Sequence, residues 1–165
     1  MFRISLAVLF LFLGKAWTAP VPAKNKDMEP FDALSHKYIK ELVENARKEG
    51  RQNIDGSDSK ENQIPTGTIL VYVTSDKQYG KLMIVEYGTD LKIKWVTYHK
   101  DGGVATKGEN RIVKGTWWCD LDTVLEGDRN SRLKGGDFWW QLKTKTSRSI
   151  EFRNGALFAV YSSEK

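Results

Sequence analysis

Two pairs of adjacent tryptophans are the residues whose type and spacing most clearly indicate chemistry at a surface. They are Trp117-Trp118 in GTWWCDLDT and Trp139-Trp140 in GGDFWWQLK, both in segments that read as β-strands. Neighbouring side chains of a strand point to opposite faces, so each pair should place one indole in the core and the other outward. An outward indole exposes apolar surface, which often marks a contact site.

Strand alternation near the C-terminus groups several polar residues with one of these indoles. Trp139, Gln141 and Lys143 alternate with an apolar set that includes Trp140, so we expect Trp140 in the core and Trp139 exposed on the outer face. The next strand along the chain ends at Arg153, on the same predicted outer face. These four outward residues are therefore candidates for ligand binding.

The other tryptophan pair is divided by the same argument. Trp117 shares its parity with Cys119 and Leu121, which favours this set for the core and leaves Trp118 outward as a fifth candidate. A bulge at Gly115 would reverse the assignment.

An exposed indole beside amide and charged groups suits a sugar ring. The flat ring can pack against the C–H face of a sugar while amide, carboxylate or basic groups hydrogen-bond its hydroxyls. The same amphipathic ring also suits a membrane interface or the centre of a protein interface. Stacking on nucleic acid bases is disfavoured by the predicted secretion described below. If a second layer covers the outer face, both members of each pair are core residues instead.

Acidic residues are concentrated between the two tryptophan pairs. Calcium takes about six to eight oxygen ligands, and the spacing here matches no calcium loop. Nearby Arg129, Arg132 and Lys134 also neutralise the segment. We therefore predict no metal and no cofactor, and interpret 120–137 as a solvated functional loop, of which 122–136 would form the rim of the binding site. The acidic residues of this region are Asp120, Asp122, Glu126, Asp128 and Asp137.

Catalytic signatures are weak in this chain, and we predict a protein that is not an enzyme. The two histidines, His36 and His99, belong to no local Ser-His-Asp or Cys-His pattern. No phosphate loop, zinc spacing or dinucleotide fingerprint occurs. A carboxylate pair that hydrolyses glycosides is the catalytic alternative.

The N-terminus predicts the compartment. Met1 to Arg3 carries a positive charge, and an apolar run of about ten residues and several small residues follow. This layout is typical of a signal peptide, here 1–19 with candidate cleavage sites over 16–23. The apolar run is too short for a transmembrane helix, which needs roughly 20 apolar residues. We expect a secreted, extracellular protein. Its lone cysteine, Cys119, allows no internal disulfide and is expected to be buried.

The rest of the chain divides into a mixed segment and a β-rich segment. Residues 20–63 form an N-terminal extension with an amphipathic helix over 30–49 and a flexible linker over 50–63. Residues 64–165 form a mainly β domain, an antiparallel meander closed as a sandwich or small barrel. The formal net charge is +5, which suits an anionic partner.

Together these features predict a secreted, non-catalytic, basic binding protein. Its expected ligand is an extracellular glycan or an anionic surface. The outward tryptophans and the basic residues would carry this carbohydrate-binding function. The alternatives are a membrane-active or toxin-like β-protein and a matrix or signalling protein that binds another protein. Nucleic acid is not an expected partner.

Overall fold

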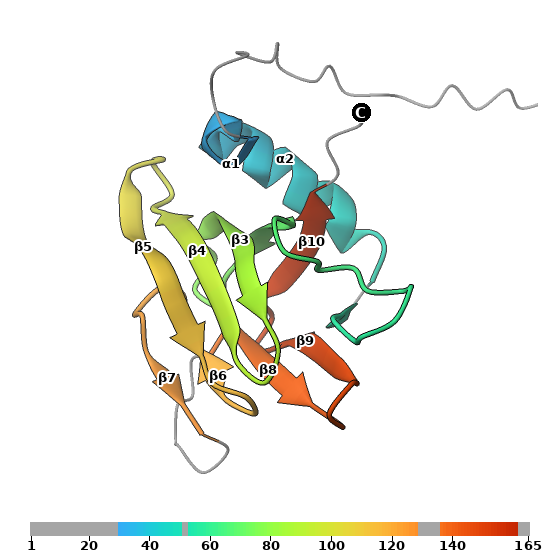
Figure 1. The fold of residues 1–165 in the computed structure, drawn as a ribbon. Coiled ribbons are helices and arrows are strands. Elements are labelled where there is room, and N and C mark those ends of the chain that lie inside the picture. Colours follow the sequence, from blue (N-terminus) through green and yellow to red (C-terminus); the bar gives the residue numbers. More distant parts are fainter. Residues whose placement is uncertain (1–29, 51–52, 129–135, 162–165) are drawn as a thin grey trace, which may run out of the picture.

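The computed structural model describes residues 30–50, 53–128 and 136–161, and the chain forms two short helices and ten strands there (Figure 1). The predicted signal peptide, residues 20–29 and residues 129–135 of the predicted rim loop lie outside the described residues. The helices are α1 (Pro30–Ala33) and α2 (His36–Arg47), and the strands are β1 (Asn53–Asp55), β2 (Ile69–Val73), β3 (Tyr79–Tyr87), β4 (Leu91–Tyr98), β5 (Val104–Val113), β6 (Trp118–Cys119), β7 (Glu126–Gly127), β8 (Phe138–Leu142), β9 (Arg148–Phe152) and β10 (Leu157–Tyr161).

The strands form two five-stranded antiparallel sheets packed as a sandwich. Sheet A has the order β1-β9-β8-β6-β7, and sheet B has the order β10-β2-β3-β4-β5. The predicted mainly β class is confirmed, and of the two closures considered the structure is the sandwich. Between the sheets lies one core, to which sheet A contributes Phe138, Trp140 and Ile150, and sheet B contributes Tyr72, Leu82, Ile93 and Trp95.

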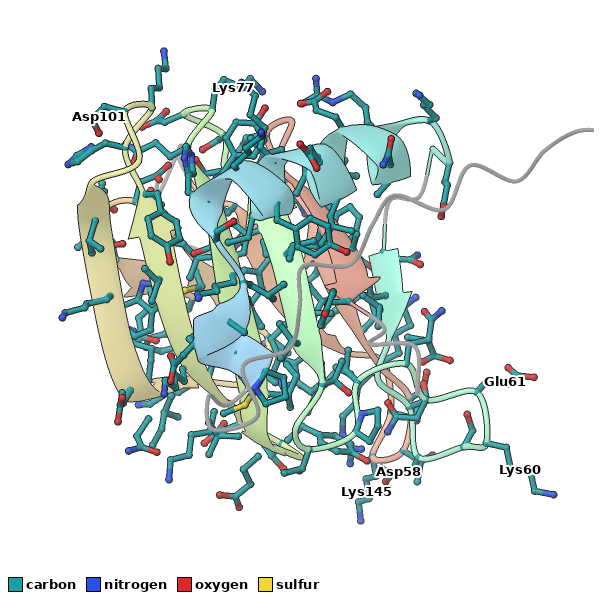
Figure 2. All side chains as sticks on the ribbon, turned by 90° about the horizontal axis from the view of Figure 1, so that it is seen from above. Asp58, Lys60, Glu61, Lys77, Asp101 and Lys145 are labelled. Atoms are coloured by element: carbon teal, nitrogen blue, oxygen red, sulfur yellow. The ribbon has the colours of Figure 1, made fainter. Side chains whose placement is uncertain are left out.

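The helices cover the opposite face of sheet B and make a third layer (Figures 1 and 2). Ile39 and Val43 of α2 are fully buried against a second apolar cluster that includes Val71 and Val73 of β2. Because both of its faces are covered, β2 is buried along its whole length. This explains why its sequence, ILVYV, is continuously apolar rather than alternating.

The predicted helix over 30–49 is interrupted. Ser35 caps α2, since its side-chain oxygen accepts a hydrogen bond from the Tyr38 backbone N–H at 3.3 Å. The preceding carbonyls of Phe31 and Leu34 accept hydrogen bonds from the buried ammonium of Lys81. These partners satisfy the backbone groups that a continuous helix would have paired internally.

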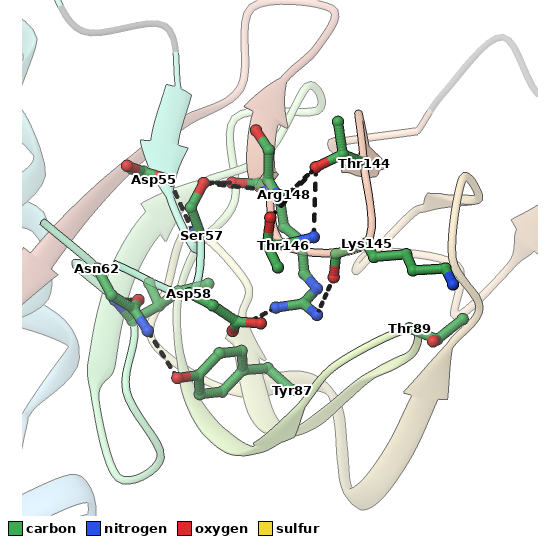
Figure 3. A network of polar contacts seen from close by, with 12 residues as sticks. Asp55, Ser57, Asp58, Asn62, Tyr87, Thr89, Thr144, Lys145, Thr146 and Arg148 are labelled. Carbon is green, nitrogen blue, oxygen red and sulfur yellow. Dashed lines mark hydrogen bonds and ion pairs between the residues drawn. The ribbon is translucent and has the colours of Figure 1, made fainter. Parts of the chain in front are cut away.

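Part of the segment 50–63, whose composition predicts a flexible linker, forms a strand. Residues 53–55 form β1, in which Ile54 pairs with Ile150 of β9 and is buried. The loop that follows is held by side-chain contacts, including an ion pair between Arg148 and Asp58 at 2.6 Å (Figure 3). Composition misled the prediction because one buried isoleucine and a few short polar side chains are enough to order this segment.

Among the described residues, no helix is both long enough and apolar enough to cross a membrane.

Candidate functional site

The register of sheet A aligns the outward indoles with polar residues in a row across the strands. Trp118 of β6 pairs with Trp139 of β8, and Trp139 pairs with Glu151 of β9. Glu151 pairs in turn with Asn53 of β1. With strands about 4.8 Å apart, the row spans about 14 Å, aromatic at one end and polar at the other.

A second row lies beside the first and is polar throughout. Gln141 of β8 pairs with Ser149 of β9, which pairs with Asp55 of β1. The Ser149 hydroxyl lies 3.5 Å from the Gln141 side-chain oxygen. Together the two rows place aromatic, amide, hydroxyl and carboxylate groups on one face, which we call the outer face of sheet A.

The two outward tryptophans stack on each other. Their ring centroids are 5.3 Å apart and their planes differ by 17°. The guanidinium carbon of Arg153 lies 4.7 Å from the Trp118 ring centroid and 5.1 Å from that of Trp139, within the range of cation–π attraction.

The stack corrects one expectation. Trp139 lies on the outer face as strand parity predicts, but only 8% of its surface is exposed. Trp118 and Arg153 contact it from that side, so Trp118, which is half-buried, is the more accessible indole of the pair. Parity identifies the face of a strand on which a side chain lies, but it carries no information about what covers that face.

One carboxylate lies beside both predicted basic ligand-binding residues of this face. Glu151 lies 3.3 Å from Arg153 and 3.8 Å from Lys143. Both basic residues predicted to bind ligand are therefore held beside the same acidic residue. Lys92 and Lys94 alternate with the apolar residues of β4, but they lie on sheet B and do not add to this face.

Arg153 is held in place by the tight turn that follows β9. Its backbone N–H donates to the Asp137 carbonyl at 2.9 Å, and the Asn154 side-chain amide donates to the Gly136 carbonyl at 2.8 Å. Asn154 and Gly155 both have positive φ, 51° and 78°, but the turn is not the β-hairpin that an Asn-Gly sequence favours, because it connects β9 of sheet A to β10 of sheet B. The turn thereby fixes Arg153 beside the indole pair.

A second group of polar residues lies near the end of β6, where three carboxylates converge. Ligand oxygens of Asp120, Asp122 and Asp137 all lie within 4.8 Å of one another. Asp137 accepts backbone hydrogen bonds from Ser75 at 2.7 Å and Leu121 at 2.8 Å, which joins the turn after β2 to sheet A. Hard cations accept such oxygen ligands, and these three residues are the ones that could hold one.

Burial changes the acidity of this cluster. Burial, helped by the neighbouring carboxylates, raises the pKa of Asp137 to about 7 and that of Asp122 to about 6. The prediction of a solvated loop is wrong for Asp120 and Asp137, which are buried. The sequence did not indicate that Asp137 would join Asp120 and Asp122 in one cluster.

The cysteine and the two histidines lie in different surroundings. Cys119 is buried as predicted, and desolvation raises the pKa of its thiol well above the ordinary value, so the reactive thiolate is disfavoured. His36 packs against the rings of Tyr98 and Tyr79, with centroids 5.5 and 6.2 Å away. His99 lies beside the turn after β4, where its backbone N–H donates to the Gly103 carbonyl at 2.7 Å.

Comparison with protein-family models, curated proteins and solved structures gave no match for this chain.

Proposed function

We propose that the protein is a secreted, non-catalytic binding protein whose outer face of sheet A contacts an extracellular glycan. One observation carries the proposal. All five residues predicted from the sequence to bind ligand lie together on that face, and those residues are Trp118, Trp139, Gln141, Lys143 and Arg153.

Each part of the face has a distinct role in this proposal. The half-buried Trp118 offers an apolar surface on which the C–H face of a sugar can pack, and Trp139 supports it from beneath. Gln141 and Glu151 supply an amide and a carboxylate for sugar hydroxyls. Lys143 and Arg153 add donors at the edge. Such a combination of one apolar platform and several fixed polar groups is typical of small-ligand recognition.

The ion pairs favour a hydroxyl-rich ligand over a strongly anionic surface. Glu151 already lies beside Lys143 and Arg153, so a polyanion would have to compete with this carboxylate for both cations. A neutral glycan can instead use the carboxylate and the cations together as acceptors and donors. Secretion rests on the predicted signal peptide and is tested by N-terminal sequencing of the protein recovered from culture medium.

Glycan-array binding followed by affinity measurement tests the proposal. We expect Trp118→Ala to weaken binding by about tenfold, a change that corresponds to losing one aromatic contact. Lys143→Gln should weaken it less, while the matched variant Lys107→Gln, an exposed lysine of β5 in the other sheet, should leave it unchanged. Thermal melting of each variant separates lost binding from lost folding.

Two results would overturn the proposal in favour of the alternatives. Leakage of anionic liposomes without any glycan binding would indicate a membrane-active protein. Binding only to sulfated glycans, abolished by high salt, would indicate an anionic partner and contradict the role given to Glu151.

A further inference from the structure

The turn between β9 and β10 contains the single Asn-Gly sequence of the chain, Asn154-Gly155. Both residues are exposed, and a hydrogen bond from the Ala156 backbone N–H to the Arg153 carbonyl at 2.8 Å closes the turn. Rotations about bonds of an asparagine bring its side-chain carbonyl carbon onto the backbone nitrogen that follows, and a glycine leaves that nitrogen without a shielding side chain. The turn therefore holds, in an exposed place, the two groups that can close to a cyclic imide.

The backbone nitrogen of Gly155 lies near a positive charge. Its N–H donates no backbone hydrogen bond to another described residue, whereas the Gly155 carbonyl accepts one from Lys77 Nζ at 3.3 Å. The nitrogen must give up its proton when it attacks, and a nearby ammonium stabilises the negative charge that develops there. Because Lys77 is exposed, salt should screen this effect.

From this arrangement we infer that Asn154 is a site of spontaneous deamidation that Lys77 promotes. The Gly155 nitrogen forms a bond to Asn154 Cγ, the bond from Cγ to Nδ2 breaks, and the amide nitrogen leaves as ammonia with the proton from Gly155. Water then opens the imide at either of its carbonyls, which gives aspartate or isoaspartate at position 154. The net reaction consumes a water molecule and replaces the neutral amide with a carboxylate.

Deamidation changes the turn that fixes Arg153. In the unmodified protein, Asn154 Nδ2 donates to the Gly136 carbonyl at 2.8 Å. A carboxylate has no donor for this carbonyl and repels it, so the turn loosens and Arg153 is held less firmly beside Trp118 and Trp139. Modified chains should therefore bind more weakly through the outer face of sheet A. This consequence rests on the proposed function, whereas the modification itself does not.

Peptide mapping by mass spectrometry of the full chain, incubated in buffer at pH 8, tests the inference. We expect progressive conversion of Asn154 to aspartate and isoaspartate. Asn110 is an internal control, because it is also exposed and has a positive φ of 59° but precedes Arg111 instead of a glycine. It should stay unmodified in the same samples. An unchanged Asn154, or equal conversion at Asn110, would overturn the inference.

Substitution of Lys77 tests the promoting charge. Lys77→Gln should slow the conversion by about threefold at low salt, as expected for the loss of a partly screened charge near the reacting nitrogen. The matched variant Lys107→Gln, which changes an exposed lysine of β5, should leave the rate unchanged. High salt should slow the reaction in the unaltered protein but not in Lys77→Gln. A rate that is independent of both salt and Lys77 would refute the role given to this lysine.

Asn154→Asp reproduces the aspartate product without incubation and tests the effect on the turn. Hydrogen exchange at residues 153–156 should be faster in this variant than in the unaltered protein, and Asn110→Asp should leave it unchanged there. Unchanged exchange in Asn154→Asp would contradict the effect on the turn. If the unaltered protein binds no glycan, the proposed function fails, but conversion at Asn154 and the faster exchange would still support the modification. Peptide mapping uses the unaltered protein, so it decides the site even if a variant is unstable.

Discussion

Trp118 of β6 stacks on Trp139 of β8 at the outer face of sheet A, with ring centroids 5.3 Å apart. The two indoles come from the two tryptophan pairs of the sequence, and the strand register places them directly opposite each other. Their inward neighbours differ, because Trp140 is fully buried between the sheets whereas Trp117 is half-buried against that core. Each pair thus contributes both to packing between the sheets and to one shared aromatic cluster outside them.

Because the two stacked tryptophans differ in burial, we expect their substitution by alanine to lower the free energy of unfolding by different amounts. Trp139→Ala should lower the free energy of unfolding by about 3 kcal/mol, because it removes a large and almost fully buried ring. Trp118→Ala should lower it by about 1 kcal/mol, in line with the loss of an aromatic pair at a half-exposed position. Urea unfolding of both variants and of the double variant measures the values and their coupling. Equal losses for the two single variants would contradict the assignment of Trp118 as the accessible ring.

Strand parity could be predicted from the sequence because it depends only on local alternation. It placed Trp118, Trp139, Gln141 and Lys143 on one side of sheet A without any knowledge of the partner strands. Burial of Trp139 could not be predicted, because it depends on a residue of another strand and on Arg153 after a turn. Parity therefore gives the face, and tertiary contacts decide the exposure.

The acidic cluster and β1 could not be predicted either, because both depend on contacts between residues that are far apart in the sequence. Asp137 joins Asp120 and Asp122 only because β6 and β8 pair. Ile54 is ordered only because β9, almost a hundred residues later, offers Ile150 as a partner. Composition described each segment as solvated or flexible, and long-range pairing overrode that tendency.

The acidic cluster predicts a protein that is less stable at neutral than at mildly acidic pH. The folded-state pKa values of Asp137, about 7, and Asp122, about 6, are raised above their ordinary values, so the folded state binds more protons than the unfolded chain. The stabilisation by these protons is complete near pH 4 and is lost as pH rises through 6 to 7. Thermal melting from pH 4 to 8, in buffers with EDTA, checks this contribution against that of other groups.

Substitution of Asp122 isolates this contribution. Asp122→Asn removes one raised carboxyl and one negative neighbour of Asp137, so it should stabilise the protein at pH 8 by about 1 kcal/mol, a value discounted for partial solvent screening. The gain should vanish at pH 4, where Asp122 is protonated in the folded protein. A variant that is destabilised equally at both pH values would show that the Asp122 carboxylate is structural instead.

The buried ammonium of Lys81 predicts a local effect on the first helix. Only 3% of Lys81 is exposed, and its Nζ donates to the Phe31 carbonyl at 2.6 Å and the Leu34 carbonyl at 2.9 Å. Lys81→Met retains the apolar stem but leaves both carbonyls without these donors, at a loss of about 2 kcal/mol. Hydrogen exchange should increase at residues 31–35 more than in β2. Unchanged exchange in that segment would show that apolar packing of Phe31 and Leu34 is sufficient to hold α1.

The network around Arg148 predicts a strong contrast with a surface ion pair of the same chemistry. The Arg148 side chain is 10% exposed, bonds Asp58 at 2.6 Å and the Lys145 carbonyl at 2.6 Å, and thereby joins the loop after β1 to the turn between β8 and β9 (Figure 3). Arg148→Gln removes a nearly buried guanidinium together with both of its hydrogen bonds, so the free energy of unfolding should fall by about 2 kcal/mol. Arg47→Gln breaks an ion pair with Glu44 on α2 that is 3.3 Å long but has side chains 53% and 41% exposed, so its loss should be less than about 0.5 kcal/mol. Urea unfolding of the two variants in parallel measures the contrast, because the substitution is the same and the sites differ in the burial of the arginine and in its bond to the Lys145 carbonyl. Comparable losses at the two sites would mean that the loop after β1 is held by the pairing of Ile54 with Ile150 rather than by Arg148.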